Sequence, residues 1–184
     1  FAAADPDLFL ERFGLRDFVL YVGAIEPRGN QLAFLLAMKE CDSPVVVLGN
    51  VAPGCSWYLD ECRRAAGPRV RFLDPLDHED PMLASAYAVC GCMVVASGID
   101  GAERIALEAG ASGTPLVLFE GTSAAEYFGH QAVYIRSDDI AGIRRGVQTA
   151  LARKRSESLA KYVRTYFSWN ASARLMREAY AKAI

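Results

Sequence analysis

Six short apolar runs alternate with helical patterns along this chain, and no other feature constrains its fold as strongly. The runs occupy residues 18–22, 45–48, 70–73, 92–96, 116–119 and 132–135. Continuous apolar runs of this length are typical of strands that are buried on both faces of a parallel sheet. Because short connections between such strands give right-handed crossovers, the alternation predicts an α/β fold with a doubly wound parallel sheet of about six strands.

Helical apolar spacing fills the intervals between these runs and the end of the chain. Helices are predicted over residues 31–40, 55–66, 81–89, 124–128, 140–155, 157–166 and 170–184, with one more after residue 100. The chain has the size of a single domain at 184 residues. We predict that this domain spans residues 16–184 and that residues 138–184 are its helical C-terminal part.

Charge and cysteine usage exclude several classes of protein. The 20 basic and 22 acidic residues give a net charge of −2, which provides no basic surface for nucleic acid. No apolar run approaches the ~18 residues of a membrane span, and the first residues form no signal-peptide pattern, so we expect a cytoplasmic protein. Five cysteines without a Cys-x-x-Cys motif, with no histidine at metal-ligand spacing, favour reduced, mostly buried thiols and no metal site.

Two carboxylates, Asp100 and Glu108, lie eight residues apart directly after the apolar run at 92–96. That position is the carboxyl end of a predicted strand, where open α/β sheets bind their ligands. A helix beginning just after Asp100 would also direct unsatisfied backbone amides toward an anion. The sequence therefore predicts a nucleotide site at this edge of the sheet.

Five segments in order, including this acidic one, resemble the retaining group 1 glycosyltransferases, the glycogen-synthase-like enzymes with the GT-B fold of two facing Rossmann-like domains. The segments are GAIEPRGN (23–30), RFLDPL (71–76), DGAERIALEAG (100–110), Gly113-Thr114-Pro115 and YFSW (166–169). They span nearly the whole chain and match the C-terminal, donor-binding half of such enzymes. Residues 1–15 resemble the interdomain linker and lead-in helix, so we expect the N-terminal acceptor domain to be absent from this chain.

The resemblance assigns roles to the two carboxylates. Glu108 would accept hydrogen bonds from the two ribose hydroxyls, which a carboxylate can bind together. Asp100 stands where the family has Glu, and it would bind the donor sugar and stabilise positive charge at the anomeric carbon as the catalytic residue. Because Asp is one methylene shorter and a ~1 Å misplacement can cost about 100-fold in rate, this change implies another donor sugar or weaker catalysis.

The resemblance also implies a binding site for the diphosphate. The amides of Gly101, Ala102 and Glu103 would bind it at the start of the helix, and the glycine-rich first loop would face it from Gly23. Arg28 is the cation of that first loop nearest to the expected phosphates.

Three positions depart from the family pattern around the phosphates. Ala24 and Gly29 stand where family members commonly carry Arg and Lys, which leaves Arg28 as the cation of that loop. Glu103 replaces a usual glycine and would bring negative charge toward the phosphates unless it points away. Arg104 beside it is the expected compensating charge.

The predicted function is that of a nucleotide-sugar donor domain in a retaining glycosyltransferase of the hexosyltransferase type, acting in glycan or polysaccharide biosynthesis. It would use a nucleotide-diphosphate sugar as donor substrate and no cofactor or metal. A saccharide or lipid-linked acceptor would bind through the missing N-terminal domain, so the isolated domain is expected to be inactive. The alternative is a degenerate domain that keeps the fold and serves as a binding or scaffolding module.

Other interpretations of the same residues stay open at the level of sequence. Asp100 is as compatible with a helix N-cap as with a sugar-binding site. The basic run Arg153-Lys154-Arg155 could make a peripheral contact with anionic lipid, although a solvated helix face is the preferred interpretation. Asn170 is predicted to cap the last helix.

Overall fold

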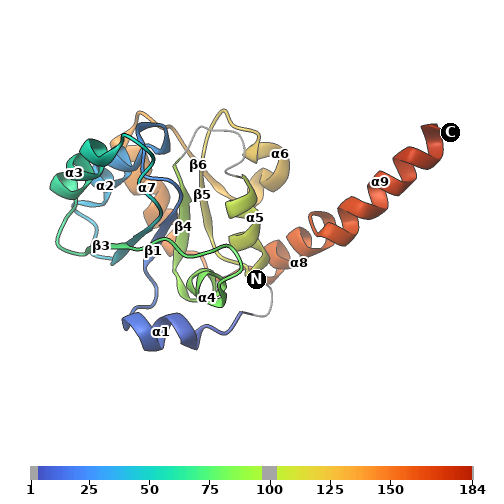
Figure 1. Cartoon of the computed structure of the whole chain (residues 1–184), viewed down its shortest axis with the longest axis horizontal. Helices are drawn as coiled ribbons and strands as arrows, with labels where there is room; N and C mark the ends of the chain where they lie inside the picture. Colours follow the sequence, from blue (N-terminus) through green and yellow to red (C-terminus); the bar gives the residue numbers. More distant parts are fainter. Residues whose placement is uncertain (1–3, 97–102, 184) are drawn as a thin grey trace.

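All six predicted strands form one parallel sheet in the computed structural model, which describes residues 4–96 and 103–183 (Figure 1). The strands are β1 Val19–Val22, β2 Val45–Leu48, β3 Val70–Leu73, β4 Cys92–Val95, β5 Leu116–Phe119 and β6 Val133–Ile135. Their spatial order is β3-β2-β1-β4-β5-β6. The chain therefore reverses its direction of growth between β1 and β4, which confirms the doubly wound topology and marks the carboxyl ends of these two strands as the ligand edge.

Helices cover both faces of the sheet (Figure 1). They are α1 Asp7–Phe13, α2 Gln31–Met38, α3 Ser56–Ala65, α4 Pro81–Val89, α5 Glu103–Ala111, α6 Ala124–Phe128, α7 Ile140–Leu151, α8 Glu157–Tyr166 and α9 Trp169–Ala183, with 3-10 turns η1 Pro27–Gly29 and η2 Gly129–Gln131. Helices α2, α3 and α7 enclose one core cluster with the sheet. Helices α1, α4, α5, α6 and α8 enclose the other.

Strand β1 shows why the apolar runs are continuous rather than alternating. Val19 and Tyr21 belong to the cluster under α2, α3 and α7, whereas Leu20 belongs to the cluster on the opposite face. All three side chains are at most 2% exposed. Because both faces of the strand are covered by helices, every position must be apolar.

The last helix differs from its prediction at its first turn. Helix α9 begins at Trp169, and the Ser168 hydroxyl accepts a hydrogen bond from the Ala171 amide at 3.2 Å. The prediction of Asn170 as the cap was therefore wrong, because Ser168 already supplies the acceptor that the first turn needs. Helix α9 projects away from the body of the domain (Figure 1), and the Trp169 side chain is 90% exposed.

The basic run after α7 does not form a uniform solvated face. Arg155 donates hydrogen bonds to the carbonyl oxygens of Tyr87 at 2.5 Å, Cys90 at 3.1 Å and Ser112 at 2.8 Å. It thus binds the ends of α4 and α5, which carry exposed carbonyl groups and the negative end of the helix dipole. Arg155 is exposed, as a solvated basic run predicts, but its guanidinium also makes these hydrogen bonds. No helix in residues 4–96 and 103–183 is long and apolar enough to cross a membrane.

Candidate functional site

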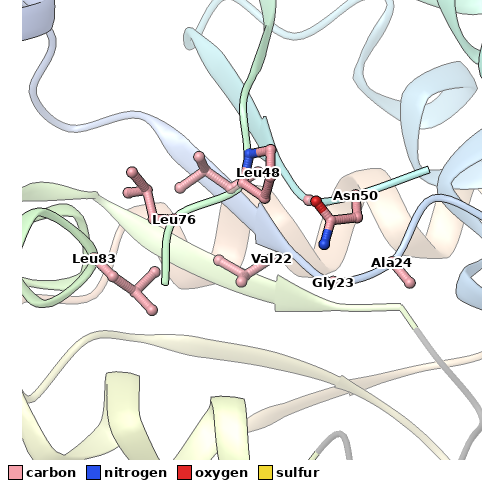
Figure 2. Close-up of a pocket in the computed structure, with 9 residues that line it drawn as sticks. Val22, Gly23, Ala24, Leu48, Asn50, Leu76 and Leu83 are labelled. Atoms are coloured by element: carbon pink, nitrogen blue, oxygen red, sulfur yellow. The ribbon is translucent and has the colours of Figure 1, made fainter. Parts of the chain in front are cut away.

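Two of the hollows that the described residues form at the carboxyl edge of the sheet adjoin the segment after β1. The first has a volume of about 190 Å³ and lies between the ends of β1 and β2, the loop after β3 and helix α4. Figure 2 shows Val22, Leu76 and Leu83 at one end of this hollow and Asn50 with Gly23 and Ala24 at the other. A mostly apolar lining with a few polar groups is typical of small-molecule sites.

Two glycines bring the ends of β1 and β2 together beneath the first hollow. Gly23 has a φ of 152°, and its amide donates to the Leu48 carbonyl at 3.0 Å. A Cβ atom on Gly49 would overlap the Gly23 carbonyl oxygen. The Gly23 amide is thus used within the sheet, and this predicted binding residue contributes a wall of the hollow.

The second hollow, of about 330 Å³, lies between η1 and the segments that follow β4, β5 and β6. Arg28 lines it opposite Phe119, Gly121 and Thr122. The Arg28 side chain is 73% exposed, and its Nη2 lies 3.5 Å from Glu26 Oε2. The structure therefore places this predicted phosphate ligand beside a cavity, with a guanidinium that can reorient at little cost.

A side chain at position 29 of the first loop would displace the side-chain amide of Gln31. A Cβ atom on Gly29 would collide with the side chain of Gln31. That side chain is fully buried, and its Nε2 donates to the Tyr21 hydroxyl at 2.8 Å and to the Ala24 carbonyl at 2.5 Å. The departure at Gly29 is thus part of a packed arrangement beneath the loop.

Glu108 lies on the inner face of α5, with a side chain that is 9% exposed. The buried Tyr87 hydroxyl donates to Oε2 at 3.2 Å. Oε1 lies 3.3 Å from His78 Nδ1 and 3.3 Å from Arg104 Nε. Burial raises the pKa of Glu108, and the neighbouring His78, Arg104 and Tyr87 oppose that rise.

The Glu103 carboxylate is turned toward Ser123. This carboxylate, in a residue that is 9% exposed, accepts a hydrogen bond from the Ser123 hydroxyl at 2.7 Å. The ion pair that the structure shows for Arg104 joins it to Glu108, one turn further along α5, and not to Glu103 as expected. Asp100, Gly101 and Ala102 lie outside the described residues, so their predicted roles stay predictions.

Sequence reasoning missed the side chains that surround Glu108. Tyr87 comes from α4 and His78 from the loop between β3 and α4, and neither was singled out as a site residue. Tyr87 lies on the same face of α4 as Leu83, which lines the first hollow. A polar tyrosine in the apolar pattern of that helix was the available signal, since a buried hydroxyl needs a partner.

No group of three or more His, Cys, Asp and Glu side chains in residues 4–96 and 103–183 is arranged to hold a metal ion. Arg28 lies by the second hollow, and Arg104 and His78 lie by Glu108.

Comparison with known proteins identifies the family. A family model described as glycosyl transferases group 1 matches residues 16–153. A comparison with curated protein sequences finds no significant match.

Solved structures share the fold at low sequence identity. Sucrose-phosphate synthase from Thermosynechococcus elongatus superposes with a TM-score of 0.79 at 23% identity, over 95% of this chain and 48% of that one. Alr3699/HepE from Anabaena, in complex with UDP and glucose, superposes with a TM-score of 0.77 at 16% identity, over 97% and 51%.

The C-terminal domain of a group 1 glycosyl transferase, LpcC from Francisella tularensis, superposes with a TM-score of 0.74 at 16% identity, over 91% of this chain and 95% of that domain. The chain thus spans about half the length of the first two structures and nearly all of this isolated C-terminal domain. The chain belongs to the group 1 glycosyltransferases, a family of retaining enzymes that use nucleotide-sugar donors, and it has the fold of their C-terminal, donor-binding domain.

Proposed function

We propose that this domain binds the nucleoside diphosphate of a sugar donor across the carboxyl edge of its sheet. The base occupies the hollow of Figure 2, and the ribose hydroxyls bind Glu108. The diphosphate lies between Arg28 and the amides of Gly101, Ala102 and Glu103. A volume of about 190 Å³ is below the roughly 300–1,000 Å³ of pockets for drug-sized ligands, so the first hollow holds a base but not a whole nucleotide sugar.

One observation carries this assignment: the same two elements border the first hollow and Glu108. The loop between β3 and α4 supplies Leu76 to the hollow and His78 to Glu108. Helix α4 supplies Leu83 to the hollow and, one turn later, Tyr87 to Glu108. A base and a ribose joined by one glycosidic bond require such adjacent sites.

Catalysis in this proposal belongs to the whole enzyme. Asp100 binds the donor sugar and stabilises positive charge at the anomeric carbon, and a saccharide or lipid-linked acceptor binds on an N-terminal domain outside residues 1–184. The isolated domain then binds donor without transferring sugar. Glycan or polysaccharide biosynthesis in the cytoplasm, with at most a peripheral membrane contact, is the setting that suits this chemistry.

Titration calorimetry with UDP, GDP and ADP tests the proposal. UDP is the first choice because the Anabaena structure contains it. We expect one nucleotide to bind and Glu108→Gln to weaken it at least tenfold, about 1.4 kcal/mol. Glu61→Gln, which removes an exposed carboxylate from α3, is the matched control and is expected to leave affinity unchanged.

A second pair of ligands tests the phosphate site. Arg28→Ala is expected to weaken the binding of UDP more than the binding of uridine. The reason is that the guanidinium would contact the diphosphate, which uridine lacks. Absence of binding by any nucleotide at millimolar concentration would refute the donor-site proposal.

A degenerate binding module is the second candidate, and two observations favour it. Gly29 replaces the usual cation of the first loop and packs against the Gln31 side chain, and Oε1 of Glu108 is buried beside His78 and Arg104. The same titration separates the two candidates, since a degenerate domain binds no nucleotide.

A further inference from the structure

The two oxygens of Glu108 have different surroundings. Oε2 accepts a hydrogen bond from Tyr87, a residue with no exposed surface. Oε1 is equally buried, yet no residue in 4–96 or 103–183 donates a well-formed hydrogen bond to it. Two nitrogen atoms lie near it instead, His78 Nδ1 and Arg104 Nε, each at 3.3 Å.

The side chains of His78 and Arg104 can leave Oε1, whereas the tyrosine cannot leave Oε2. The His78 side chain is 47% exposed and that of Arg104 is 67% exposed. Moving them outward sacrifices little packing, and the Oε1 contacts lack the geometry of strong hydrogen bonds. Tyr87 is part of the core cluster between α4 and the sheet, so its hydroxyl stays in place.

A buried carboxylate of this kind needs its positive neighbours. Desolvation disfavours its charged form, and an opposite charge within about 4–6 Å restores it. Within residues 4–96 and 103–183, the ionisable groups that face Glu108 are Tyr87 from α4, His78 from the loop before it, and Arg104 from α5 itself. The ionised carboxylate is the better acceptor for a ribose hydroxyl, because a protonated carboxyl group uses one of its oxygens as a donor.

We propose that His78 and Arg104 are positioning residues for the ribose-binding carboxylate: they hold Oε1 of Glu108 in the free protein and yield it to a ribose hydroxyl when nucleotide binds. This inference rests on the proposed function, because it assumes that Glu108 is the ribose ligand. In this inference, His78 and Arg104 influence the affinity for the donor only by their effect on the Glu108 carboxylate. The bound nucleotide then replaces two long contacts with a hydroxyl hydrogen bond, while Tyr87 keeps the carboxylate oriented.

The first measurement needs no nucleotide. The Glu108 carboxyl carbon is followed by ¹³C NMR against pH, with Glu108→Gln used to assign its signal. Arg104→Met and His78→Gln each remove a positive or potentially positive neighbour, so we expect the Glu108 titration midpoint to move to higher pH in both. Arg104→Lys restores the charge and is expected to bring the midpoint back toward the wild-type value.

The second measurement is nucleotide affinity across pH 5.5–8.5, with UDP, GDP and ADP as probes. In Arg104→Met we expect affinity within about twofold of wild type, or tighter, at pH 8.5, the end of this range at which protonation of Glu108 limits binding least. The acid-side loss of affinity is expected to begin at higher pH than in wild type. A merely structural role for Arg104 would weaken binding by the same factor at every pH. Arg63→Met, an exposed arginine of α3, is the control and is expected to leave both readouts unchanged.

The outcomes separate this inference from the function on which it rests. If nucleotide binds and depends on Glu108, but neither Arg104→Met nor His78→Gln moves the titration midpoint or the acid limb, the positioning role is wrong and the donor site stands. If no nucleotide binds the wild-type protein at any pH, both the donor site and the exchange with ribose are wrong.

Discussion

Arg155→Met removes a guanidinium that joins three segments at the amino edge of the sheet. Arg155 follows α7 in sequence, and it donates to Tyr87 O and Cys90 O at the end of α4 and to Ser112 O beyond α5. It also donates to the Thr114 hydroxyl at 3.1 Å. Methionine keeps most of the aliphatic stem and removes all four of these hydrogen bonds.

The expected loss of unfolding free energy is estimated from the carbonyl oxygens that accept hydrogen bonds from Arg155. Tyr87 O keeps a second donor, the Thr114 hydroxyl at 2.7 Å, so we count the bonds to Cys90 O and Ser112 O alone. A hydrogen bond from a charged donor contributes roughly 1.5–3 kcal/mol. Because water reaches part of the Arg155 side chain, the lower figure applies, and the two bonds together give a loss of about 3 kcal/mol.

Urea denaturation followed by circular dichroism measures this loss, and thermal unfolding should show a fall in Tm of roughly 6–12 °C for a chain of this size. Arg153→Met is the matched control. Arg153 lies two residues earlier, and no side-chain hydrogen bond or ion pair of Arg153 is found among the described residues. The control should change the free energy of unfolding by less than about 0.5 kcal/mol. An Arg155→Met protein as stable as this control would refute the reasoning.

Three further predictions concern other parts of the domain. Gly49→Ala places a Cβ against the Gly23 carbonyl, and overpacking against backbone should cost about 2–3 kcal/mol in urea denaturation and also reduce nucleotide affinity in calorimetry. Trp169→Ala should change the free energy of unfolding by less than about 0.5 kcal/mol, because that side chain is 90% exposed; a larger loss in urea would show that α9 packs on the domain. The raised pKa of Glu108 means that the folded state binds its proton more tightly than the unfolded state does. This stabilisation is complete below the unfolded pKa of about 4.3 and is lost as pH rises through the folded pKa. Glu108→Gln should therefore gain stability relative to wild type between pH 4 and pH 7 in urea denaturation, and an unchanged difference would contradict the assignment.

The location of the candidate site could be predicted, because it depends only on the order of strands and loops along the chain. Glu108 and Arg28 follow the ends of β4 and β1, and the carboxyl ends of neighbouring parallel strands always meet at one edge of a sheet. The surroundings of Glu108 were not open to prediction in the same way. They join α5 to Tyr87, 21 residues earlier, and to His78 in a separate loop.

Charged side chains were the least predictable part. Arg104 was expected to offset Glu103 next to it, but helical geometry brings it onto the same face as Glu108, four residues further on. Arg155 was predicted to be one of a run of solvated cations, but its guanidinium also donates hydrogen bonds to carbonyl groups at the ends of α4 and α5. Sequence gives the charge of such residues, while the packing of the elements decides which acceptor each one meets.

The sequence by itself determined the six strands, their parallel arrangement and the edge at which we propose that the donor binds. Those properties follow from runs of apolar residues and from the handedness of their connections, which are local or depend only on order along the chain. Tertiary structure alone decided that Glu108 is buried between Tyr87, His78 and Arg104, and that Gly29 packs against Gln31. These contacts depend on distances between elements that are far apart in sequence, and only the packed sheet and helices fix those distances.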